Sequence, residues 1–360
     1  MTSTSFYTYA TETRLCNSPL VRLRQLIDWE VLARRLVGIR KNEVNSAGGP
    51  LGYDYTKMFR ALLLGQWHSL SDAQLEQALR VRLDFMTFAG FDLDEDVPDA
   101  TTVCRFRNAL IERGLIEELF REINRQLSSQ GLMVQESQGA VIDATLVESA
   151  ARPNRVIEMT EDRREPDIEQ VIVNQEEIVN KEAAVNQEAA VDKEAVRVEE
   201  SKDPDARWLK KGNKCYFGYK VFAVVDAEKG YIQRLYSTPA NVSEVRQLGV
   251  LVDGLPAGTR VYADKGYASA ENRKWLFDRG LRDGICCKAV VKRPLGHWQR
   301  LRNRIISSTR VIVERAFGSL KRQWRFARAS YNTLEKVHTQ ALLKAMCYNM
   351  LKAVRMVQFA

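Results

Sequence analysis

The sequence has few of the residues that build metal sites or disulfide frameworks. Its 360 residues include 6 cysteines and 3 histidines, and no two cysteines have the Cys-x-x-Cys spacing. Zinc ribbons and disulfide scaffolds depend on such pairs, so the pattern fits neither, and reduced thiols are expected. Three histidines (His68, His297 and His338) also give poor support to a metalloprotease or a histidine-based nucleophile relay.

Long hydrophobic runs are absent as well. The best apolar stretch, residues 59–64, is far shorter than the roughly 20 residues that a membrane span needs. Residues 1–14 are polar and lack the apolar core of a signal peptide. With 45% hydrophobic residues, the chain is expected to fold into two or three globular domains in the cytoplasm.

Positive charge is concentrated in one part of the chain. Residues 158–205 hold 16 acidic and 6 basic residues, a net charge of −10, so the remainder carries +18. Between residues 274 and 328, 15 lysines and arginines face 3 acidic residues. Such a concentration predicts a polyanionic partner, because neutralised phosphates release counterions. A solvated basic face would have the same composition.

Residues 1–135 are expected to form an all-helical module. Capping residues and apolar periodicity predict helices over residues 18–37, 54–66, 71–82, 100–113 and 115–130. In the helix over 100–113, Val103, Phe106 and Leu110 share one buried stripe. A helix that reads a DNA groove needs polar side chains on its other face. The candidates there are Thr101, Thr102, Arg105 and Asn108. An ordinary amphipathic surface helix would show the same pattern.

From residue 139 the pattern predicts a mixed α/β architecture. Strands are expected over residues 140–143, 216–225, 231–237 and 260–263, and helices over 242–253, 268–279, 309–323 and 334–357. A mixed sheet flanked by helices is the natural arrangement. The acidic insert at 158–205 contains a six-residue repeat without a single apolar stripe, so it is expected to be a mobile or loosely helical arm.

Two acidic residues are expected at strand ends. Asp143 closes the stretch VID at 141–143, and Asp264 closes VYAD at 261–264. A lone aspartate at a strand end is usually a turn or cap residue. Two carboxylates at one edge of a sheet repel each other unless a cation lies between them, and Mg²⁺ and Mn²⁺ are the oxygen-seeking candidates.

A third carboxylate lies in the helix predicted from residue 309. At 100° per residue, Arg310, Glu314 and Lys321 share one narrow polar stripe. An acid framed by two cations suits a metal ligand beside bound phosphates. An Arg–Glu pair on a solvated helix face is the simpler alternative.

These residues resemble the pattern of the DDE transposases of bacterial insertion sequences, specifically the insertion-sequence-five family with its ribonuclease-H-like core. The matching stretches are VIDAT at 141–145, VYADKGY at 261–267, and the Arg-x3-Glu-x6-Lys spacing of Arg310, Glu314 and Lys321. Where the family often has Tyr, this chain has Ser307, which puts any role of that Tyr in doubt. VPDATT at 97–102 and CRFRN at 104–108 resemble the family's N-terminal helical module.

The resemblance implies a transposase that cleaves DNA at terminal inverted repeats and joins the freed 3′ ends to target DNA. It implies two Mg²⁺ ions (replaceable by Mn²⁺) bridged by Asp143, with Asp264 and Glu314 each holding one. Arg310 and Lys321 would neutralise phosphates. Further candidate DNA contacts are Lys265, Arg302, Arg315 and Arg322. The implied partners are double-stranded DNA and further copies of the chain, in a homodimer or higher assembly in the bacterial cytoplasm, associated with the nucleoid when bound to DNA.

The expected organisation follows from the resemblance and the patterns together. Residues 1–135 form a helical module for DNA binding or dimerisation, residues 136–157 and 206–330 form the ribonuclease-H-like core, and residues 331–360 form a C-terminal helix. Two alternatives stay open. One is a ribonuclease-H-like nuclease without strand transfer, and the other is a DNA-binding regulator that does not cut.

Overall fold

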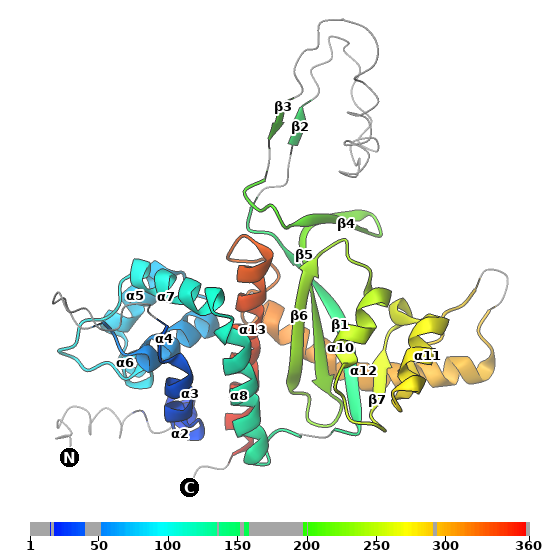
Figure 1. Cartoon of the computed structure of the whole chain (residues 1–360), viewed down its shortest axis with the longest axis horizontal. Helices are drawn as coiled ribbons and strands as arrows, with labels where there is room; N and C mark the ends of the chain where they lie inside the picture. Colours follow the sequence, from blue (N-terminus) through cyan, green and yellow to red (C-terminus); the bar gives the residue numbers. More distant parts are fainter. Residues whose placement is uncertain are drawn as a thin grey trace, which may run out of the picture. The chain divides into compact units, whose positions relative to one another are not determined.

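The computed structural model describes residues 15, 18–39, 52–134, 137–151, 155–157, 197–199, 201–290 and 294–357 (Figure 1). Contacts within the chain define two compact units, Met1–Ala150 with Asp205–Ala360, and Ala151–Pro204. The boundaries predicted after residues 135 and 330 fall inside the larger unit and remain predictions.

The N-terminal part of the larger unit is helical, as its sequence predicts. The helices are α2 (Pro19–Leu26), α3 (Trp29–Leu36), α4 (Tyr55–His68), α5 (Asp72–Val81), α6 (Leu83–Ala89), α7 (Ala100–Glu112) and α8 (Leu115–Ser129). Ser18, Asp54, Ser71 and Asp99 cap their helices by accepting hydrogen bonds from backbone N–H groups of the first turn.

Three details of the helical part differ from the prediction. The single helix expected over 18–37 is divided, because Asp28 accepts hydrogen bonds from the N–H groups of Glu30 and Val31 and starts a second helix. The helix α6 was not predicted, and α4 continues to His68, two residues beyond its predicted end at residue 66. The divided helix and the additional helix arise where a cap or a short apolar segment interrupts one apolar periodicity.

A six-stranded mixed sheet forms the second part of the larger unit. Its strands are β1 (Gly139–Glu148), β4 (Arg207–Lys211), β5 (Lys214–Asp226), β6 (Ile232–Pro239), β7 (Arg260–Ala263) and β8 (Arg282–Ile285). The order is β4-β5-β1-β7-β8, and β6 pairs with β5. The β1–β5 and β5–β6 pairs are antiparallel, whereas β1, β7 and β8 are parallel. The predicted mixed sheet is confirmed, and β4 and β8 are additional to it.

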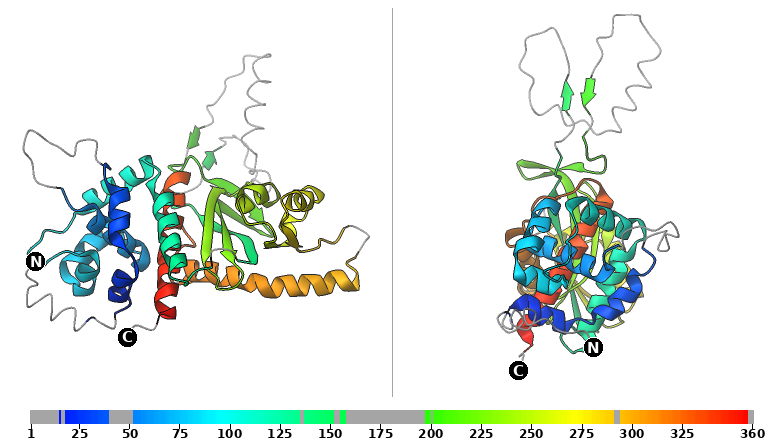
Figure 2. Two further views of the ribbon diagram at one scale, coloured as in Figure 1. Left: turned by 60° about the horizontal axis from the view of Figure 1, so that its bottom comes forward. Right: turned by 90° about the vertical axis from the view of Figure 1, so that its left-hand side faces the viewer.

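Helices cover both faces of this sheet (Figure 2). On one face, strand residues Ile142 and Val261 pack with Leu248 and Leu276. Leu248 belongs to α10 (Leu248–Val252) and Leu276 to α11 (Ala270–Asp278). The short helices η2 (Glu244–Gln247) and η3 (Lys265–Tyr267) precede them along the chain. The alternate residues of the strands, such as Val141, pack with α12 (His297–Arg322) and α13 (Leu334–Met356). Alternation along each strand therefore builds two cores.

The helix α13 connects the helical part to the sheet. It packs against α2, α4 and α8 as well as against β6. Asn349 makes the junction specific, because its Nδ2 donates to Asn124 Oδ1 of α8 and to the Ile232 carbonyl of β6, each at 2.8 Å. The predicted C-terminal helix is thus a shared core element of the larger unit.

The smaller unit contains one pair of short strands in the part that the structure describes. The strands β2 (Arg155–Ile157) and β3 (Arg197–Glu199) are antiparallel. The acidic repeat, expected to be a mobile or loosely helical arm, lies outside the described residues. None of the helices described in either unit is long and apolar enough to cross a membrane.

Candidate active site

Asp143 lies in the middle of a strand, not at its end. The prediction that the strand stops at Asp143 is wrong, because β1 continues to Glu148 through its pairing with β5. The side chain lies on the same face as Val141, the face that α12 covers, and is 18% exposed. The strand therefore holds this carboxylate rigidly and largely out of water.

Asp264 follows the end of β7 directly, as predicted. Parallel pairing of Val141 with Tyr262 brings Asp143 and Asp264 to neighbouring positions on β1 and β7. Asp264 Oδ1 accepts a hydrogen bond from the Gly266 N–H at 2.5 Å. A Cβ at position 266 would lie 2.7 Å from this oxygen, so a larger residue there would displace the Asp264 carboxylate from its place in the turn.

The charge of Asp143 is stabilised by one cation. Arg310 of α12 donates from Nη2 to Asp143 Oδ2 at 2.9 Å, and its side chain is only 14% exposed. Burial raises the pKa of Asp143, and the neighbouring carboxylate of Asp264 adds to the rise, while Arg310 opposes it. The buried guanidinium of Arg310 therefore offsets, at Asp143, the repulsion between the two carboxylates.

The third predicted acid does not join this pair. Glu314 lies one turn beyond Arg310 on α12 and is exposed. No three His, Cys, Asp or Glu side chains in the described ranges are close enough to hold a metal ion together. Lys321 is partly buried, and its pKa is lowered by burial and by Lys211, with Glu148 opposing. The structure thus brings together Asp143, Asp264 and Arg310, but not Glu314.

Two further residues belong to the site and were not assigned from the sequence. The ring of Tyr267 is fully buried, and its hydroxyl has no hydrogen-bond partner among the described residues. Burial raises the pKa of Tyr267 well above its usual value, and the negative charges of Glu244, Asp143 and Asp264 raise it further. This buried hydroxyl, a possible hydrogen-bond donor, is thus near enough to three carboxylates to be affected by their charges.

Glu244 is the second unassigned residue. Its Oε2 would lie 2.8 Å from a Cβ at Gly266, which places it beside the turn of Asp264. Lys220, buried in β5, lies 3.4 Å from Glu244 Oε1 and donates to the Val242 carbonyl at 2.8 Å. Tyr267 is the last residue of the motif VYADKGY at 261–267 and could have been identified from it. The sequence around Glu244 contains no comparable motif.

The donor set at Asp143 and Asp264 fits a hard divalent cation. Both donors are carboxylate oxygens, which Mg²⁺ and Mn²⁺ prefer. A cation between them would relieve their repulsion, a task that Arg310 performs for Asp143 in this structure. The buried, unpartnered Tyr267 hydroxyl beside these acids is a second sign that the polar cluster is made for an additional group.

The candidate DNA-reading helix α7 has its apolar residues on the buried face and polar residues on the outer face, as predicted. Val103, Phe106 and Leu110 are buried, whereas Thr101 and Arg105 are exposed. Thr102 and Asn108 are partly buried, and Asn108 Nδ2 is 3.9 Å from Cys104 Sγ. A bidentate ion pair of Arg107 with Asp72, at 2.8 and 2.9 Å, fixes α7 to α5. The helix is thus held rigidly with Thr101 and Arg105 outward.

The predicted DNA contacts of the core differ in their surroundings. Lys265 and Arg315 are exposed. Arg322 is exposed and donates to the Gly318 carbonyl at 3.3 Å. Arg302 instead pairs with Asp283 at 3.1 Å and donates to the Asp283 carbonyl at 3.0 Å, which fixes α12 to β8.

Comparison with known proteins identifies the class of protein. Residues 184–350, which include Asp264 and Glu314, match the family described as "Transposase DDE domain". Residues 10–109 match the family described as "Transposase domain (DUF772)". The chain is also 43% identical over 249 residues to the transposase for insertion sequence element IS1106 of Neisseria meningitidis serogroup B, covering 69% of this chain and 76% of that relative. No solved structure matches.

These matches place the chain among the enzymes that cleave and join DNA in transposition. The chain belongs to the DDE transposases of insertion sequences. Its core is accordingly ribonuclease-H-like, with a mixed sheet flanked by helices.

Proposed function

We propose that this transposase cleaves DNA at the terminal inverted repeats of its element and transfers the freed 3′ ends to target DNA. The observation that carries the proposal is the pair of acids, Asp143 and Asp264, aligned on neighbouring parallel strands beneath Arg310. In-line phosphoryl transfer depends on positioning and on charge stabilisation, and a rigid sheet supplies both. The motifs also favour the insertion-sequence-five family.

Asp143, Asp264 and Glu314 would hold Mg²⁺, with two ions as the proposed number and Mn²⁺ as a substitute. Bound there, the metal supplies activation of the attacking water or 3′-hydroxyl and stabilisation of the leaving oxygen. Burial favours protonation of Asp143, and Arg310 opposes this by stabilising the charged carboxylate. Released from Asp143, the guanidinium is placed to neutralise a phosphate beside the scissile bond. Lys321, further along the same helix, would neutralise another.

The exposed residues Thr101 and Arg105, with Thr102 and Asn108 beside them, would contact the element's ends. Lys265, Arg315, Arg322 and, less directly, the ion-paired Arg302 would contact the DNA backbone. Transposition would require the two ends of the element to be cleaved and joined together, which favours a homodimer or higher assembly of the chain.

A strand-transfer assay separates transposition from the alternatives. The full chain, incubated with duplexes that carry the element's ends, a target plasmid and Mg²⁺, should release 3′ ends and join them to the plasmid. Cleavage without joined products would indicate a nuclease without strand transfer. Binding to the ends without either reaction would indicate a DNA-binding regulator and contradict the proposal.

End recognition can be tested on α7. Arg105→Ala should weaken binding to the element's own ends by about 1–3 kcal/mol, because an exposed arginine on a rigid helix is suited to a base contact. Binding to a scrambled duplex should change less, as measured by competition. Glu112→Ala on the same helix, also exposed, is the control. Equal losses on both duplexes would assign Arg105 to the DNA backbone, and no loss would favour a role of this module in pairing protomers.

A further inference from the structure

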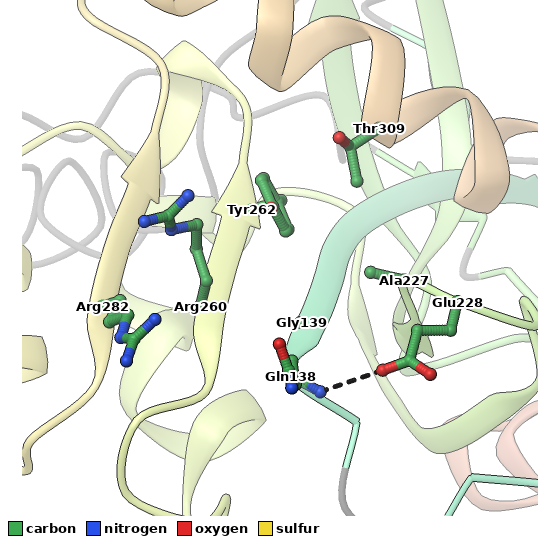
Figure 3. A pocket seen from close by; sticks show the side chains of 8 residues that line it. All are labelled: Gln138, Gly139, Ala227, Glu228, Arg260, Tyr262, Arg282 and Thr309. Carbon is green, nitrogen blue, oxygen red and sulfur yellow. Dashed lines mark hydrogen bonds between the residues drawn. The ribbon is translucent and has the colours of Figure 1, made fainter.

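An open cavity of about 560 Å³ lies at the opposite end of β1 and β7 from Asp264 (Figure 3). Gly139 and Arg260, the first residues of these strands, line it together with Thr309 of α12. Thr309 precedes Arg310, the residue that contacts Asp143. The cavity therefore lies on the face of the sheet that carries the acids.

Two arginines on neighbouring strands give the cavity its charge. Arg260 and Arg282 are direct partners in the parallel β7–β8 register, and both side chains are exposed. Asp283, the neighbouring acid in β8, is paired instead with Arg273 and Arg302. Like charges directly opposite each other destabilise a sheet, so this arrangement favours an anion that bridges both guanidiniums.

The wall beside the arginines is aromatic and closely fitted. A Cβ at Gly139 would lie 2.9 Å from the ring of Tyr262 and 2.8 Å from Ala227 Cβ, so the ring packs directly on the glycine backbone. Figure 3 shows Tyr262 between the arginines and Glu228. Glu228 accepts a hydrogen bond from the Gln138 N–H at 3.2 Å, and its charge repels an anion from that side of the cavity. An anion is thus directed to the arginines.

We propose that Arg260 and Arg282 bind a backbone phosphate of the DNA strand that enters the active site. Arg260 and Asp264 are four residues apart, a span of about 13 Å at roughly 3.3 Å per strand residue. Successive phosphates of one DNA strand are about 3.4 Å apart along the helix axis. The bound phosphate therefore lies within a few nucleotides of the scissile bond. This inference rests on the proposed function.

The site can be tested by replacing the charged phosphates of the DNA backbone, one at a time, with neutral linkages. Duplexes of the element's end, each with one neutral methylphosphonate linkage, are bound by the full chain and by Arg260→Gln/Arg282→Gln. For the wild-type chain, one position near the scissile bond should weaken binding about tenfold. In the double variant this position should lose its effect, while the rest of the profile stays unchanged.

Two further variants make the test specific. Arg246→Gln/Lys274→Gln removes two exposed positive charges carried by η2 and α11 and should lower binding without removing that position from the profile. Glu228→Gln should strengthen binding at the same position, because it removes the repelling charge. The proposal would be overturned if Arg260→Gln/Arg282→Gln gave the same binding profile as the wild-type chain. It would also be overturned if Arg246→Gln/Lys274→Gln removed the effect of the same position. If the phosphate site is overturned in this way while the wild-type chain still cleaves the element's ends, the proposed function holds without the site.

Discussion

Replacing Asp143 or Asp264 with asparagine is expected to reduce DNA cleavage and joining by about a thousandfold or more. The amide keeps the shape of the side chain but removes the charge that holds a cation, and stabilisation by such a cation is worth several kcal/mol. Binding to end duplexes should stay within about threefold, because in the proposed mechanism these acids hold the metal and not the DNA. Cleavage and binding are measured on the same preparations, with Asp278→Asn, an exposed acid at the end of α11, as the matched control.

Glu314→Gln should cause the same loss, although Glu314 lies exposed on α12 outside the cluster. The reason is that two acids leave a divalent ion short of protein ligands. Glu244→Gln is the informative comparison, because Glu244 already lies beside the turn of Asp264. Normal cleavage by Glu314→Gln together with inactivity of Glu244→Gln would transfer the role of third acid to Glu244. Near-normal cleavage by Asp143→Asn would remove the acidic pair from the mechanism altogether.

Activity is expected to disappear in the presence of a chelator and to return with Mg²⁺ or Mn²⁺. Ca²⁺ should support DNA binding but little chemistry, because its larger and more flexible coordination positions the reacting groups poorly. Cleavage measured in metal-free buffer and after addition of each ion checks this. Full activity in the chelator-treated preparation would contradict a metal mechanism.

The metal requirement should also depend on pH with a defined sign. Because burial raises the pKa of Asp143, a cation competes with a proton there at higher pH than at an ordinary aspartate. The metal concentration for half-maximal activity should therefore increase as the pH falls. Arg310 lowers this pKa. In Arg310→Gln the loss of activity on acidification should therefore begin at a higher pH than in the wild-type chain. If activity is lost at the same pH in both chains, a group other than Asp143 controls this pH dependence.

Much of the fold follows from local signals in the sequence. Caps at Ser18, Asp54, Ser71 and Asp99 set helix starts correctly because each satisfies backbone donors of its own first turn. The stretch at 260–263 was recognised as a strand because it is apolar and ends at Asp264. By contrast, the extension of β1 beyond Asp143 depends on pairing with residues of β5 that lie 70 or more positions further along the chain. No local pattern records such a partner.

The same distinction applies to the site. Asp143, Asp264 and Arg310 could be named from short motifs, and the structure brings them together. Glu244, Lys220 and the arginines at 260 and 282 could not, because their relation to the acids arises only from strand register and from the turn at Gly266. The start of α12 at His297, before the predicted 309, extends an exposed and highly charged segment that apolar periodicity does not detect.

Binding of Mn²⁺ to the protein–DNA complex, followed by electron paramagnetic resonance, tests the acidic centre most directly. The complex of the wild-type chain with an end duplex should bind Mn²⁺ that the Asp143→Asn/Asp264→Asn complex does not bind, at equal DNA occupancy. Mg²⁺ should displace this Mn²⁺ from the wild-type complex. Equal Mn²⁺ binding by both complexes would show that Asp143 and Asp264 do not hold the metal.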